Sequence, residues 1–81
     1  FCSPPAVALS RRIAPSLAFE LLTTGDFLSA GRAHAIGLVN RLAAPETLDT
    51  LSRDLATRIA AKDPGAIRLG KAAFRAQLGL P

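Results

Sequence analysis

The sequence predicts a mainly α-helical chain with four to five helices and one short extended segment. Apolar residues recur at helical spacing in several stretches, and glycines and prolines separate these stretches. The only aromatic residues are four Phe, so Leu, Ile, Val and Ala must form the core. A hydrophobic content of 49% with 20% charged residues argues against disorder. With 81 residues, the chain is one domain at most.

The first two helices are predicted from prolines and a glycine. Residues 1–5 are expected to form a loop, since prolines lack an N–H donor and fix φ. A short helical turn follows, with Pro5 as its first residue. A longer helix should run over residues 15–23, and Gly25 suits the left-handed conformation that ends many helices.

The third helix is predicted between Ser29 and Gly37. Ser29 is a candidate N-cap, and Gly37 is a second stop. Gly31 lowers the intrinsic helicity by roughly 1 kcal/mol relative to Ala, so this helix should depend on packing. The run 38–42, directly after it, has an extended, half-buried character.

Two longer helices are predicted in the second half. Pro45 fits the first turn of one, and Asp63 and Pro64 are a plausible N-cap and first residue of the other. Gly79 ends the last helix. The first of the two is clearly amphipathic, with its apolar face formed by Leu48, Leu51, Leu55 and Ile59.

The charge, the single cysteine and the first residue limit the classes of function that we consider. The net charge of +4 is spread out without a block of like charges; we interpret it as solvated helix faces, the alternative being attraction to an anionic partner. The lone Cys2 cannot form an internal disulfide, which fits a reducing compartment. No apolar run approaches the ~20 residues that span a bilayer. The chain starts at Phe1 and contains no Met, so we expect an incomplete chain.

No residue in the sequence predicts catalysis or metal binding. One Cys, one His and six scattered acids give no ligand spacing. We interpret His34 as a partly exposed helix residue. Among the acids, Glu20 is the strongest candidate for a general base, but we interpret it as solvated or ion-paired. The helices around Gly25 could form a helix-turn-helix, but the second offers only Arg32 and His34 to read bases. Nucleic-acid binding is therefore not predicted.

Two segments resemble the enoyl-CoA hydratase/isomerase (crotonase) family. The first is similar to the family pattern TG-x-x-(I/L)-S-A-x-x-A-x-x-x-G-L-V-N, and the second to P-x-x-L-x-x-x-x-x-x-L-A-x-x-I-A-x-x-x-P. The first matches at Thr24, Gly25, Leu28, Ser29, Ala30, Ala33, Gly37, Leu38, Val39 and Asn40. The second matches at Pro45, Leu48, Leu55, Ala56, Ile59, Ala60 and Pro64, followed by Ala66, Lys71 and Ala72.

The resemblance implies the C-terminal helical part of a crotonase-type α/β spiral fold. Residues 1–42 would hold the end of the spiral core and its first helices, and residues 43–81 a helical part for packing and oligomerisation. In the family, two backbone amides polarise an acyl-CoA thioester and two glutamates handle water. None of these catalytic groups maps onto this chain. The resemblance places only a backbone amide at Ser3, with Cys2 beside it, near the substrate.

The parent protein is therefore expected to hydrate 2-enoyl-CoA thioesters in fatty-acid metabolism, or to be a related isomerase. Its substrate would be the coenzyme A thioester, with no other cofactor. We expect a homo-oligomer, a trimer or a dimer of trimers, in the cytoplasm or the mitochondrion, without a membrane or nucleic-acid partner. The 81 residues alone should be inactive. The alternative is a stand-alone, small, basic helical module that binds protein or nucleic acid and is not an enzyme.

Overall fold

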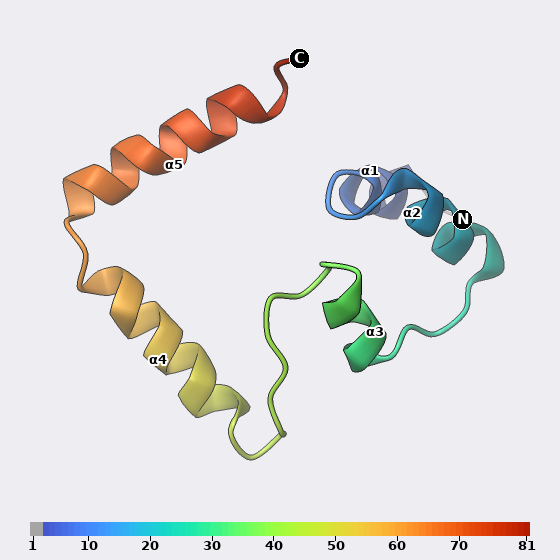
Figure 1. Cartoon of the computed structure of the whole chain (residues 1–81), viewed down its shortest axis with the longest axis horizontal. Coiled ribbons are helices and arrows are strands. Elements are labelled where there is room, and N and C mark those ends of the chain that lie inside the picture. Colours follow the sequence, from blue (N-terminus) through green and yellow to red (C-terminus); the bar gives the residue numbers. More distant parts are fainter. Residues whose placement is uncertain (1–2) are drawn as a thin grey trace. The chain divides into compact units, whose positions relative to one another are not determined.

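The computed structural model describes residues 3–81 and contains five helices and no strand there (Figure 1). They are α1 (Ser3–Ser10), α2 (Pro15–Thr24), α3 (Ala30–Ala35), α4 (Leu48–Ala60) and α5 (Pro64–Leu78). The predicted mainly helical fold is confirmed. The chain divides into two compact units, Phe1–Leu42 and Ala43–Pro81, and each is described by itself.

Helix α1 begins earlier than the sequence predicts. The prolines predict a loop through residue 5, but α1 starts at Ser3 and includes both Pro4 and Pro5. Proline is tolerated in a first turn because the N–H groups there have no intrahelical acceptor. The loop prediction is therefore wrong for residues 3–4, whereas Pro5 is helical as predicted but is not the first helical residue. Residues 1–2 of the predicted loop lie outside the described residues.

Helices α1 and α2 pack against each other around a tight corner (Figure 1). The backbone N–H groups of Arg12 and Ile13 both donate to the carbonyl of Leu9, at 3.0 and 3.1 Å, which closes α1. The Ile13 side chain is buried in this corner, and Ala18 in α2 is buried too. Because residue 18 carries only a methyl group, it can be enclosed without forcing the neighbouring backbone apart.

Glycine ends α2 in the way that the sequence predicts. Gly25 has φ 66°, and its N–H donates to the Leu21 carbonyl at 3.0 Å. A residue with a side chain is strained at this φ, whereas glycine is not. The hydroxyl of Thr24 donates to the Glu20 carbonyl at 2.8 Å and so satisfies another carbonyl of the last turn.

Helix α3 is short and is fixed at both ends. The hydroxyl oxygen of Ser29 accepts a hydrogen bond from the Arg32 N–H at 3.1 Å, which confirms the predicted N-cap. At the other end Gly37 has φ 82°, and Leu38 donates its N–H to the Ala33 carbonyl at 2.9 Å. This six-residue bond is part of a Schellman motif. The Ala33 side chain is buried beneath it.

The run after α3 differs from the predicted half-buried extended segment. Leu38 is half-buried, but Val39 and Leu42 are 39% and 50% exposed. The N–H groups of Leu38 and Val39 both donate back to the Ala33 carbonyl, at 2.9 and 3.3 Å. The run therefore starts as a continuation of the helix-ending turn and forms no strand.

Helix α4 begins three residues later than Pro45, where the sequence predicts its first turn. The N–H and the hydroxyl of Thr47 both donate to the Ala44 carbonyl, at 3.0 and 3.2 Å. This turn precedes the first α-helical bond, from the Leu51 N–H to the Thr47 carbonyl at 2.9 Å. Proline thus fits the turn that leads into the helix rather than the helix itself.

Helix α5 begins as predicted. Pro64 is its first residue, and the Asp63 carboxylate accepts the Ala66 N–H at 2.9 Å. Gly79 lies directly after its last residue. No residue of the unit Ala43–Pro81 is buried, and only Leu51 and Leu55 are half-buried. Both helices of this unit therefore keep their apolar faces exposed. Within residues 3–81, no helix has the length and apolarity that a bilayer crossing requires.

Candidate functional site

The predicted substrate-contacting residues lie at the start of α1. Ser3 is its first residue and is exposed, and Cys2 lies outside the described residues. The first N–H groups of a helix have no partner within it, and Pro4 and Pro5 have no N–H to offer. The Ser3 N–H therefore has no acceptor within α1, as a role through its backbone amide requires.

The titratable side chains in the described part of the chain do not form a catalytic group. Glu20 and His34 are both exposed. The single ion pair within residues 3–81 joins Asp49 and Arg53 at 2.9 Å, so Glu20 is not ion-paired there. Of the two interpretations of Glu20, the solvated one holds.

The described part of the chain also contains no cluster of metal-binding side chains. No three His, Cys, Asp or Glu side chains of residues 3–81 come together at a position that could hold an ion. Such a site needs at least three ligands arranged around one point.

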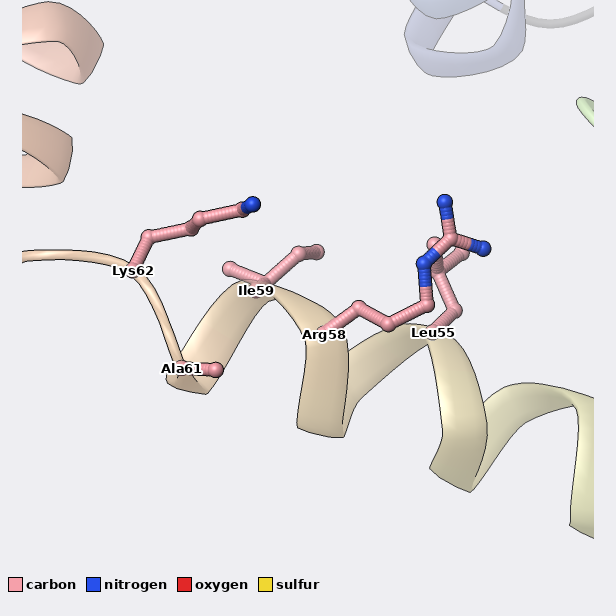
Figure 2. A pocket seen from close by; sticks show the side chains of 5 residues that line it. All are labelled: Leu55, Arg58, Ile59, Ala61 and Lys62. Carbon is pink, nitrogen blue, oxygen red and sulfur yellow. The ribbon is translucent and has the colours of Figure 1, made fainter.

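Basic and apolar side chains gather where α4 turns into α5. Two adjoining surface hollows of about 300 and 370 Å³ lie there. Figure 2 shows the side chains of Leu55, Arg58, Ile59 and Lys62 on one side of α4. We call this surface the basic elbow, lined by Leu55, Arg58, Ile59, Ala60, Ala61, Lys62, Pro64, Ile67, Arg68 and Lys71.

The spacing of residues along the sequence indicates the basic elbow, whereas the overall composition does not. Residues 55, 58, 59 and 62 follow the spacing of one helix face, and so do residues 64, 67, 68 and 71. The Asp63–Pro64 junction joins the two helices and brings these faces to one corner. The interpretation of the net charge as solvated helix faces treats each helix separately. It therefore misses the cluster of basic side chains at the junction of the two helices.

A third hollow lies between α1 and α2. It has a volume of about 350 Å³ and an apolar lining that includes Val7, Ala18, Phe19 and Leu22. It contains no charged side chain. This hollow offers apolar contact but no group for acid, base or anion chemistry.

The chain is similar to enoyl-CoA hydratases in sequence and in structure. It superposes on an enoyl-CoA hydratase from Mycobacterium smegmatis with a TM-score of 0.95 and 46% identity, over 100% of this chain and 32% of that one. It is 40% identical over 78 residues to "Enoyl-CoA hydratase domain-containing protein 3, mitochondrial" of Rattus norvegicus, which covers 96% of this chain and 26% of that protein. The chain belongs to the enoyl-CoA hydratase (crotonase) family.

A bacterial crotonase relative gives the same result. The chain is 43% identical over 65 residues to a "Crotonyl-CoA hydratase" of Syntrophomonas wolfei, over 80% of this chain and 25% of that protein. It thus spans about a quarter of the length of the curated relatives that it matches. No protein-family model matches the chain.

Proposed function

We propose that the protein to which this chain belongs hydrates 2-enoyl-CoA thioesters in fatty-acid metabolism. The observation that carries the proposal is the likeness to named enoyl-CoA and crotonyl-CoA hydratases over 80% of the chain or more. In this chemistry two backbone amides stabilise the enolate, and glutamates move the protons. The name of the rat relative supports a mitochondrial location.

In this proposal the chain supplies packing surfaces and part of a subunit interface, as the C-terminal helical region of a trimeric crotonase. The support is the exposure of the apolar faces on α4 and α5: Leu48 is 55% exposed and Phe74 is 61% exposed. Side chains of this size are stabilising only when they are removed from water. Several exposed apolar side chains of this size on two helices are typical of a surface that another part of the protein covers.

The proposal also assigns a role to the start of α1. The N–H of Ser3 would lie beside the water that adds to the double bond, and Cys2 would neighbour it. A backbone donor fixed in a first helical turn can orient a water molecule without a change of conformation. The coenzyme A thioester is the substrate, and no other cofactor enters the proposal.

Crotonyl-CoA hydration tests the proposed activity. The gene product that contains these residues should hydrate crotonyl-CoA, while the isolated 81-residue chain should not exceed the buffer rate. The measurement is the loss of the conjugated thioester absorbance, with and without protein. Hydration by the isolated chain would show that catalytic groups lie within it and would contradict the proposal. An inactive gene product that is correctly folded would contradict the hydratase assignment.

A charge on the apolar face of α4 tests the packing role. Leu51 is half-buried, and Leu51→Asp should split the oligomer or destabilise the gene product by about 3 kcal/mol, because the carboxylate would lose its hydration on assembly. Thr50→Asp adds the same charge to an exposed position of the same helix and is the matched control. Sedimentation and urea unfolding compare the two variants. Equal effects would show that this face of α4 remains in water.

A further inference from the structure

We draw no further inference here: the strongest candidate, the apolar hollow of about 350 Å³ between α1 and α2, carries none because nothing in the structure shows which ligand or which part of the protein covers it.

Discussion

Isolated in solution, the 81-residue chain should lose its helices gradually on heating, without a cooperative transition. The buried hydrophobic residues within residues 3–81 are Ile13, Ala18 and Ala33, and two of the three are alanines. Cooperative unfolding needs a core whose loss releases many contacts at once. The unit Ala43–Pro81 has no buried residue at all, so its helices lack tertiary support.

Differential scanning calorimetry measures this directly. A chain of this length with an ordinary core would absorb about 55 kcal/mol in one peak, and we expect no such peak. The control is the gene product that contains the same residues, in which a peak should appear because the apolar faces are covered. A sharp transition of the isolated chain would contradict the prediction and would favour the alternative of a self-sufficient binding module.

The ends of the helices were predictable because local chemistry determines them. Ser29 and Asp63 each cap a helix through a side-chain oxygen, and Gly25 and Gly37 each accept a positive φ. These features need only neighbours a few residues away, which the sequence provides. The start of α4 was not predictable in the same way, since a turn held by two bonds from Thr47 competes with the helix.

The candidate site was only partly predictable. The sequence identifies the position of Ser3 through a family pattern, and the structure adds that Ser3 lies in the first turn of a helix. The basic elbow was missed, because its two faces meet only once the Asp63–Pro64 junction sets the corner. The resemblance to crotonases rests on residues at fixed spacing, such as Gly37 and Asn40. These residues belong to a structural segment and not to a catalytic group.

Two alanine substitutions within and after α3 should have opposite effects on stability. Gly37 has φ 82°, so Gly37→Ala should lower the free energy of unfolding of the gene product by about 1–2 kcal/mol. Gly31 lies inside α3 without a positive φ, so Gly31→Ala should raise it by about 0.5–1 kcal/mol. A Cβ at either position meets no atom within 4 Å, so neither change introduces a clash.

The opposite signs separate backbone conformation from side-chain size. Both variants add one methyl group, and both positions are exposed, so hydrophobic burial cannot distinguish them. Urea unfolding of the gene product gives both free energies from the same transition. Gly25→Ala, at φ 66°, should follow Gly37→Ala, because the two glycines end their helices with the same left-handed conformation. If Gly37→Ala and Gly31→Ala shifted stability in the same direction, the turn after α3 would not depend on the left-handed φ.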